Sequence, residues 1–548
     1  MAEEVYDIII CGAGSGGGFF AGEVAPYASV LLLDAGPNVA SEALPGFGSP
    51  ARRKVATQIN LGNYHPDNPF FNRGALFYAY PMYMIESNPI NASIAREARV
   101  VGGGSYINVG AWIRPRRIDW DGFAEETGVQ GWTKNEFERH FLKAEQILNV
   151  HRDPRSVWNK ASILYEQAAQ SLGIPTFAVA SNRRNCIYCG HRLNAGMPCK
   201  YDALMSTAIT QIPKAMSYGA KVEGDANVVR VLIENNRAVG VTYIKEREAI
   251  TARARKLVVL SGGAIGTPLI MRSSGLHLIN DNVGRFLRAH PGVPLDVLLP
   301  GDDWNSDRGY QWNVAHYIHD DNSEPIDVLA FASASFPSNT PWVAASVGFF
   351  GKPYKDLMRR FRQRAGVFLF EKKPARFGRV VGTVEGPEVF YPVVDKTGVL
   401  EPKMLNDFHI AVRQTNEIFQ RMGAITTFPP ADTPPALLDQ LLTLFVTTTG
   451  AIHSQGTCRA GASPSNSVCD TYGLMHEIDG LMCCDASVIP HHISSNPNSL
   501  IMALANRQAE FAVRNILGRA INPDYHVSVP EQPQLPNSGE TRPAEIPA

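Results

Sequence analysis

The chain has 548 residues, of which 45% are hydrophobic and 19% charged, the composition of an ordinary globular enzyme. Its 51 lysines and arginines nearly balance 52 aspartates and glutamates, giving a formal net charge of -1, and no long basic run occurs. These figures exclude a nucleic-acid-binding protein. No signal-like segment opens the chain and no window approaches the roughly 18 apolar residues of a membrane span, so we expect a soluble, cytoplasmic protein.

The first predicted elements are a strand and a glycine-rich turn. In "DIIICGAGSGGG" the apolar stretch Ile8–Ile10 runs directly into Gly12, Gly14 and Gly17, and a helix-like apolar pattern follows. Gly12 permits the tight turn, Gly14 lets the backbone approach a pyrophosphate, and Gly17 allows the helix to pack closely on the strand. Ser15 stands at the start of this helix, whose N-terminal N–H groups would face the phosphates.

A second strand, in "SVLLLDAGP", supports a nucleotide site. It ends in Asp34, which lies about twenty residues beyond the glycines, where a ribose-binding acid belongs. An acid at this position argues against a 2′-phosphate. The alternative, a glycine-rich turn without a ligand, is disfavoured by this context. The residues up to this point predict a dinucleotide and leave FAD and NAD open.

A second glycine run follows in "ARVVGGGSYINVGAWIRPRRIDWD", at residues 102–104. Glycines let backbone lie flat against a ligand ring, where any Cβ would intrude. Asn108 supplies both a donor and an acceptor for a polar ring edge. This stretch is therefore a second candidate for cofactor contact.

The middle of the chain contains three further patterns. "TKNEFERHFLKAEQIL" predicts a surface helix with a capping box between Thr133 and Glu136. "NVVRVLIENNRAVGVTYI" predicts a hairpin that turns near Asn235 and Asn236. "KLVVLSGGAIGTP" is typical of a parallel strand buried on both faces, and residues 292–445 contain alternating patterns of an antiparallel sheet.

Three cysteines lie close together in "NCIYCGHRLNAGMPCKYDA": Cys186, Cys189 and Cys199, with His191 between them. Three thiolates could hold a three-iron cluster, or a structural zinc together with His191. The spacing is wrong for these groups, so we favour a loop of buried or free thiols over a metal site at Cys186, Cys189 and Cys199.

Several of these stretches carry a family resemblance. Residues Ala98–Asp121 resemble the first signature of the glucose–methanol–choline (GMC) family of FAD-dependent oxidoreductases, and "GAIGTPLIMRSSGLH" resembles the second, with His277 in place of the usual final glycine. "DNVGRFLRAHP" and the block from "HSQGTCRAG" to "SSNPNSLIMALANR" are also similar to family stretches. The resemblance extends from about residue 5 to about residue 518 and implies FAD as the cofactor.

The resemblance also implies which residues contact FAD. Some relatives tether FAD through a histidine in the first signature, but no histidine lies between Pro66 and Arg139, so we expect non-covalent FAD. The backbone of Val228 is expected to meet the adenine. The full set of expected FAD contacts is Gly12, Gly14, Ser15, Gly17, Asp34, Arg99, Gly103, Gly104, Asn108, Val109, Val228, Asp485, Ala486, Asn496 and Pro497.

The implied fold is mixed α/β with two domains. A Rossmann-like FAD-binding domain is expected to consist of the separated segments 1–45, 90–150, 220–291 and 446–520. A substrate-binding domain with an antiparallel sheet is expected to contain segments 46–89, 151–219 and 292–445. The proline- and acid-rich tail, 521–548, is expected to be extended or disordered.

The family oxidises alcohols by removing the hydroxyl proton and passing hydride to flavin N5. The family histidine that takes the proton precedes a Gly-Thr pair, which matches His453 in "HSQGTCRAG". The second catalytic position, a histidine or asparagine about forty residues later, falls on Asn496. One titratable base and one neutral amide imply that a single pKa dominates the low-pH limb of the rate profile.

Other roles stay open for these residues. His453 could be a core histidine bonded to a carbonyl, and Asn496 could cap the long helix that follows, unless Asn498 is the cap. The adjacent pair His491 and His492 has no catalytic place in the family pattern and is expected to be structural or to line the rim of the substrate site.

The predicted function is FAD-dependent oxidation of a primary or secondary alcohol by an oxidase that uses O2 and releases H2O2. A sugar or polyhydroxy substrate is favoured because the cysteine segment resembles that of bacterial FAD-dependent glucose and fructose dehydrogenases. The alternatives are a dehydrogenase that passes electrons to a quinone or cytochrome partner, a lyase that keeps FAD without redox turnover, and an NAD-dependent dehydrogenase. A homo-oligomer is possible, and the sequence indicates neither the substrate nor the oligomeric state.

Overall fold

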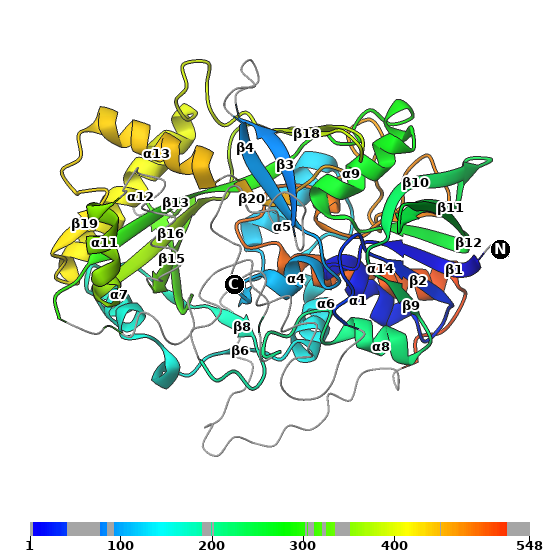
Figure 1. The fold of residues 1–548 in the computed structure, drawn as a ribbon, viewed down its shortest axis with the longest axis horizontal. Helices are drawn as coiled ribbons and strands as arrows, with labels where there is room; N and C mark the ends of the chain where they lie inside the picture. The colour runs from blue at the N-terminus through cyan, green and yellow to red at the C-terminus, as the bar shows by residue number, and fades with distance from the viewer. Residues whose placement is uncertain are drawn as a thin grey trace.

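The computed structural model describes residues 4–40, 77–84, 92–188, 199, 202–301, 304, 312–320, 325–334, 351–449 and 451–522. Two seven-stranded sheets organise this part of the chain and lie at opposite ends of the molecule (Figure 1). Helices cover both sheets, which confirms the mixed α/β class expected from the sequence.

The first sheet contains the strand that opens the described chain. Ile8, Ile9 and Ile10 are completely buried, and their strand pairs in parallel with a neighbour on each side. This explains why the stretch is apolar without alternation. The order is β10-β11-β12-β1-β2-β9 with β21 beside β12, from β1 (Glu4–Cys11), β2 (Val30–Leu33), β9 (Lys221–Glu223), β10 (Asn227–Glu234), β11 (Arg237–Lys245), β12 (Glu248–Leu260) and β21 (Leu481–Cys483).

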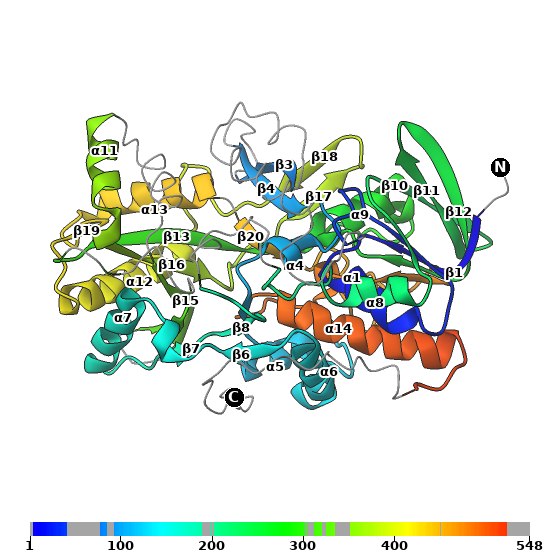
Figure 2. The same cartoon turned by 60° about the horizontal axis from the view of Figure 1, so that its bottom comes forward.

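Helices pack against the first sheet and against one another. Figure 2 shows the long α14 running alongside α1, with α6 and α8 close by. Apolar side chains of α1, such as Phe19 and Phe20, are completely buried in the core between these helices and the sheet. The helices are α1 (Ser15–Val24), α6 (Lys134–Ile147), α8 (Gln211–Ser217), α9 (Gly263–Ser273) and α14 (Asn498–Phe511).

The second sheet is antiparallel throughout and has the order β19-β13-β16-β15-β14-β7, with β20 beside β13. Helices α7, α12 and α13 pack against it and share its apolar core. Its members and covering helices are β7 (Phe177–Ala178), β13 (Arg288–Leu298), β14 (Val314–His319), β15 (Pro325–Ala334), β16 (Arg364–Glu371), β19 (Thr426–Phe428), β20 (Ala451–Gln455), α7 (Lys160–Ser171), α12 (Pro402–Arg421) and α13 (Pro435–Thr449).

Two smaller sheets complete the described strands, one of four strands and one of three strands in the order β5-β8-β6. A four-stranded sheet lies between the large ones in both views and has the order β17-β18-β3-β4 (Figures 1 and 2). The remaining elements are β3 (Phe77–Tyr83), β4 (Ala92–Ala98), β5 (Ala111–Trp112), β6 (Val150–Arg152), β8 (Ala180–Asn182), β17 (Arg379–Gly382), β18 (Pro387–Phe390), α4 (Gly103–Ile107), α5 (Arg117–Thr127) and α11 (Lys352–Arg359).

The pairing of β13 with β20 joins segments that the sequence analysis assigns to different domains. β20 lies in the segment 446–520, expected in the FAD-binding domain, yet it is a strand of the second sheet. β13 begins at Arg288, four residues before the expected segment 292–445. The second sheet therefore contains a strand from a segment that the sequence analysis places in the FAD-binding domain.

Local sequence signals match the structure at several points. Asn235 and Asn236 form the turn between β10 and β11, both with positive φ, as a tight hairpin requires. The Thr133 hydroxyl accepts a hydrogen bond from the Glu136 amide at the start of α6. Asn498 is different: it is the first residue of α14 and not its cap, since its Oδ1 accepts from Ser15 Oγ at 2.7 Å.

The predictions for the C-terminal tail and for the cysteine segment fall partly on residues outside the described ranges. The tail is described only to residue 522, and Cys189 and His191 of the cysteine segment are not described. Within the described residues, no helix is long and apolar enough to cross a membrane.

Candidate active site

A cavity of about 410 Å³ lies between the first sheet, the four-stranded sheet and β20. Its size is in the range of small-molecule and cofactor sites. It extends from the carboxyl ends of β1 and β2 to β20. The sequence-predicted residues that line it are Gly12, Gly14, Ser15, Asp34, Arg99, Gly103, Gly104, Val228, His453, Asp485, Ala486 and Pro497.

Two glycine segments meet at the floor of this cavity. A Cβ added at Gly103 would lie 2.5 Å from the Cα of Gly14, and Gly103 has a φ of 50°. The two backbones can approach so closely only because neither residue has a side chain. Gly104 is different, because a Cβ there would meet no atom within 4 Å. The glycines thus form a shallow backbone cradle that is open toward the cavity.

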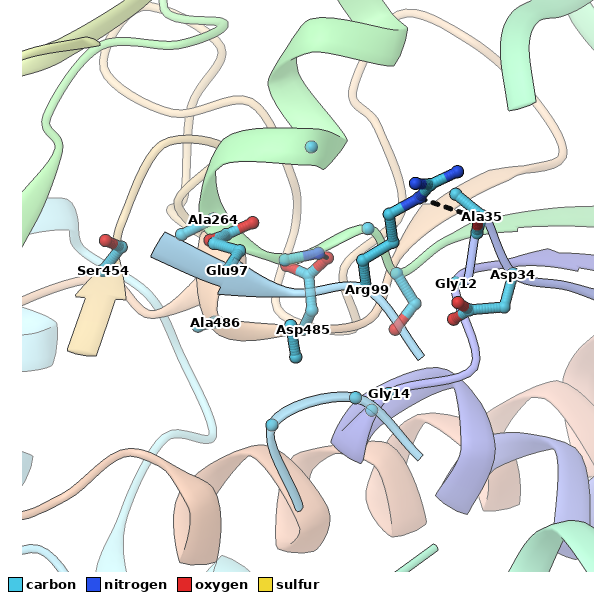
Figure 3. A pocket seen from close by; sticks show the side chains of 18 of the residues that line it. Gly12, Gly14, Asp34, Ala35, Glu97, Arg99, Ala264, Ser454, Asp485 and Ala486 are labelled. Carbon is cyan, nitrogen blue, oxygen red and sulfur yellow. Dashed lines mark hydrogen bonds between the residues drawn. The ribbon is translucent and has the colours of Figure 1, made fainter. Parts of the chain in front are cut away.

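Asp34 and Arg99 lie at one end of the cavity (Figure 3). The carboxylate of Asp34 accepts hydrogen bonds from the amides of Ala13 and Gly36, each at 2.8 Å. Burial raises the pKa of Asp34 to about 6, although these amides oppose the shift. Arg99 donates from Nε to the carbonyl of Ala35 at 2.9 Å. Asp34 therefore holds the glycine turn in place and also faces the cavity.

Glu97 and Asp485 lie side by side near the N-terminus of α9 (Figure 3). Asp485 accepts hydrogen bonds from the Gly263 amide at 2.9 Å and from the Thr267 hydroxyl at 2.6 Å. Glu97 Oε1 accepts from the Ile265 amide at 3.1 Å, whereas Oε2 is buried without a hydrogen-bond partner among the described residues. Burial, followed by repulsion from Asp485, raises the pKa of Glu97 to about 8.

Four predicted cofactor residues do not line the cavity. Gly17 packs under the turn, where a Cβ would lie 2.0 Å from the Gly12 carbonyl oxygen. The Asn108 side chain accepts from the Gly110 amide at 2.9 Å, and the Val109 carbonyl accepts from Arg183. Asn496, the fourth, contacts another buried side chain, described below.

His453 borders the cavity at its other end, on β20. β20 pairs with β13 across an irregularity between Arg288 and His290, and His453 has a φ of 63°. Irregularities of this kind redirect side chains near active sites. The Nδ1 atom of His453 lies 3.0 Å from Nδ1 of His290. Burial, and then the charge of Lys372, hold the pKa of His453 well below its usual value.

A chain of contacts connects His453 to Asn496. His290 is completely buried, and Lys372 Nζ lies 3.3 Å from its Nδ1. The same ammonium lies 3.4 Å from Oδ1 of Asn496. On the other side of the His290 ring, Nε2 lies 3.3 Å from Nε2 of Gln455. The structure thus brings both predicted catalytic residues into one cluster of polar side chains.

His491 and His492 are held outside the cavity wall. His491 Nδ1 contacts the Glu126 carboxylate, which also binds Arg288 and Arg459. His492 is buried and stacks on Phe377 with ring centroids 6.4 Å apart. Neither histidine lines the cavity, as the sequence-based interpretation of the pair expects for structural residues.

Sequence analysis missed Glu97, His290 and Lys372. Glu97 directly precedes a stretch that resembles the family and His290 lies within one, but no local pattern marks them as polar groups facing a site. Lys372, in "FLFEKKPARFG", carries no motif at all. In the described part of the chain there is no group of three side chains that could hold a metal, and because Cys189 is not described, the cysteine hypothesis is untested.

The cavity has the features of a dinucleotide site. The parallel strands β1 and β2 end at a glycine turn, a ribose-type acid follows, and α1 begins at the cavity wall. Glu97 Oε2, which has no hydrogen-bond partner among the described residues, could bond a polar group of a ligand. The empty space beside Gly104 leaves room for that ligand. The fold and the site together define a two-sheet nucleotide-binding enzyme.

Comparison with known proteins identifies the family. The GMC oxidoreductase family models match residues 7–292 and 390–505. The chain belongs to the GMC oxidoreductase family, which confirms the family inferred from the motifs and, with it, the class of FAD-dependent oxidoreductases.

Individual relatives are distant. An uncharacterized GMC-type oxidoreductase of Mycobacterium tuberculosis is 27% identical over 77% of this chain, which spans only 65% of the length of that relative. The oxygen-dependent choline dehydrogenase of Paraburkholderia xenovorans is 26% identical, covering 96% of this chain and 97% of the relative. The structure of a variant of Aspergillus oryzae RIB40 formate oxidase superposes with a TM-score of 0.71 at 15% identity, covering 93% and 98% of the two chains.

The two neighbouring glycines provide a test of the cradle. Gly104→Val should leave the melting temperature of the apoprotein unchanged but lower FAD content, because its side chain would extend into the cavity. Gly103→Ala should destabilise even the apoprotein, because its Cβ meets Gly14 and its φ is positive. Flavin absorbance per protein and thermal melting measure the two effects. Full FAD content in Gly104→Val would contradict the placement of the cofactor.

The raised pKa of Glu97 predicts that the folded protein loses stability as pH rises. Between the ordinary glutamate value of 4.5 and about 8, the unfolded chain is ionised while Glu97 in the folded protein keeps its proton, so stability falls as pH rises through this window. Glu97→Gln removes this loss. The melting temperature of the Glu97→Gln apoprotein should therefore exceed that of the wild-type apoprotein, and the difference should be larger at pH 8 than at pH 5. The exposed Glu125→Gln serves as the control, and an equal gain at both pH values would contradict the assignment.

Proposed function

We propose that this protein oxidises a primary or secondary alcohol to the carbonyl as an FAD-dependent oxidase, with O2 as electron acceptor and H2O2 as product. The observation that supports it best is the position of His453. This histidine borders the nucleotide cavity at the end opposite Asp34 and is linked to Asn496 through His290 and Lys372. A proton acceptor and a neutral amide thus belong to one chain of polar contacts beside the cavity.

FAD would lie with its adenosine near Asp34 and Val228 and its ring near His453. Bound FAD supplies the hydride acceptor, N5 of the flavin. The glycine cradle of Gly14 and Gly103 would hold the pyrophosphate region by backbone contact. Pro497 lines the cavity at the start of α14, whose partial positive charge would stabilise negative charge on the flavin.

His453 would take the hydroxyl proton of the substrate. Because burial and Lys372 keep its pKa well below the usual value, its imidazole is neutral at physiological pH and can act as a base. Asn496 would hydrogen-bond the substrate oxygen and so direct the reacting C–H bond toward the flavin. Only one of the pair titrates, so the acid limb of the rate profile should lie below the ordinary histidine pKa.

The domain roles follow from this arrangement. In this proposal the first sheet carries the cofactor and the second sheet faces the substrate. FAD would be bound non-covalently, since the sequence between Pro66 and Arg139 contains no histidine to attach it. Flavin released into the supernatant by acid precipitation would support this, and flavin retained in the protein pellet would refute it.

The substrate proposal is a sugar or another polyhydroxy alcohol. It is supported by the likeness of the cysteine segment to bacterial sugar dehydrogenases. The relatives named choline dehydrogenases favour a second candidate, an alcohol carrying a quaternary ammonium group, with a dehydrogenase reaction.

A panel of sugars, choline and simple alcohols separates these candidates. Flavin bleaching under anaerobic conditions should identify a substrate, and peroxide formation in air at a comparable rate should follow. Bleaching without peroxide would replace the oxidase by a dehydrogenase. No bleaching by any alcohol would favour the redox-inactive lyase.

His453→Ala tests the mechanism. Loss of the base should slow anaerobic flavin reduction by roughly 10²- to 10⁴-fold while FAD stays bound. Asn496→Ala should slow it less, because it removes orientation and not the proton acceptor. His409→Ala, which removes a surface histidine paired with Asp439, is the matched control and should reduce normally. Near-normal reduction in His453→Ala would remove His453 from the role of base.

A further inference from the structure

Lys372 occupies an unusual place for a charged side chain. It directly follows β16, is completely buried, and pairs with no carboxylate among the described residues. Its ammonium instead contacts Nδ1 of His290, Oδ1 of Asn496 and the face of the Phe370 ring, 4.9 Å from the ring centroid. Burial of a lysine is costly, so a lysine held among neutral side chains calls for an explanation.

An ammonium group has three donors and no acceptor. Lys372 can therefore bond His290 only if Nδ1 of that ring is the nitrogen without hydrogen, which places the His290 proton on Nε2. Nε2 faces the amide of Gln455, whose Oε1 is otherwise buried without a partner. Turning the Gln455 amide so that its oxygen faces His290 gives both groups a partner, and it gives up the contact of Gln455 Nε2 with the His453 carbonyl oxygen at 3.4 Å.

The position of the proton on His290 also determines which ring nitrogen of His453 carries a proton. Its Nδ1 lies 3.0 Å from His290 Nδ1, which carries no hydrogen, so His453 Nδ1 is the donor in this contact and shares the single lone pair of His290 Nδ1 with Lys372. A neutral imidazole that is protonated on Nδ1 has its lone pair on Nε2. The ring nitrogen left for the substrate is then an acceptor, as a base requires.

Asn496 is oriented by the same ammonium. Its Oδ1 accepts from Lys372 at 3.4 Å, so the amide NH2 is the end of the side chain that remains for other partners. That end can only donate. An alkoxide-like substrate oxygen needs a donor of this kind.

We propose that Lys372 is a positioning residue that sets the hydrogen-bond polarity of the catalytic pair, leaving His453 as an acceptor and Asn496 as a donor toward the substrate hydroxyl. The inference rests on the proposed roles of His453 and Asn496. It adds a side chain that touches neither substrate nor flavin but determines which tautomer of the base is present.

The charges around Lys372 are compatible with this role. Burial lowers the pKa of Lys372 to about 7. The carboxylates of Asp119 and Glu371 oppose this shift, and the positive charge of Arg116 adds to it. The ammonium form is therefore present at the acidic pH values at which His453 titrates. Burial, followed by the charges of Lys372, His453 and His492, holds the pKa of His290 well below its usual value.

Lys372→Met in the holoenzyme should have two effects. The rate of flavin reduction at neutral pH should fall roughly 10- to 100-fold, the usual cost of losing a group that orients a functional ligand. The acid limb of the pH profile should move to higher pH, because the cation that disfavours protonation of His453 is gone. Lys372→Arg, which keeps a donor-only cation, should retain the wild-type limb.

The neighbouring Lys373→Met is the matched control. Its ammonium points to Asp327 at 4.0 Å, and it should leave the acid limb unchanged. A merely structural role of Lys372 would lower stability and rate without moving the limb, so an unmoved limb in a folded Lys372→Met protein overturns the proposal.

NMR of isotope-labelled histidines tests the tautomer without relying on activity or on a fragile variant. The His453 signal is assigned by its loss in His453→Ala. In the wild-type holoenzyme it should show the proton on Nδ1, and a proton on Nε2 would overturn the proposal. Normal flavin reduction in His453→Ala would instead refute the proposed function, so the two failures are distinguishable.

Discussion

The structure depends on the antiparallel pairing of β13 with β20. This pairing joins the second sheet to the segment that returns from it to the first, and it places His453 beside His290. The register is irregular at this point and His453 takes a positive φ, which turns its side chain toward the cavity. The pairing thus brings the polar cluster of His453 and His290 to the end of the nucleotide cavity.

Burial of ionisable groups is the second common theme. Glu97 and Asp485 line the cavity with raised pKa values, His453 borders it with a lowered pKa, and Lys372, also with a lowered pKa, lies in the polar cluster behind His453. In each case desolvation is the largest cause, and backbone amides or neighbouring charges adjust it. Such clusters are characteristic of functional sites, because low dielectric surroundings strengthen every remaining polar contact.

Much of the nucleotide site could be predicted from short stretches of sequence. Gly12, Gly14 and Asp34 belong to a local strand–turn–helix unit, so their spacing along the chain already determines their spacing in space. The hairpin at Asn235 is local for the same reason. Asn498 shows that local patterns do not predict contacts between distant residues. Its side chain was a plausible helix cap, but it accepts a hydrogen bond from Ser15, almost five hundred residues away.

The sequence by itself determined the family and the glycine turn, and it predicted the pair His453 and Asn496, because each rests on a motif of contiguous residues. Only the tertiary structure decided that Glu97 faces the cavity and that Lys372 lies between His290 and Asn496. These contacts join residues separated by tens to hundreds of positions, and their energetics depend on burial. A linear pattern carries no measure of burial, so it could not reveal which charges the fold places in the interior.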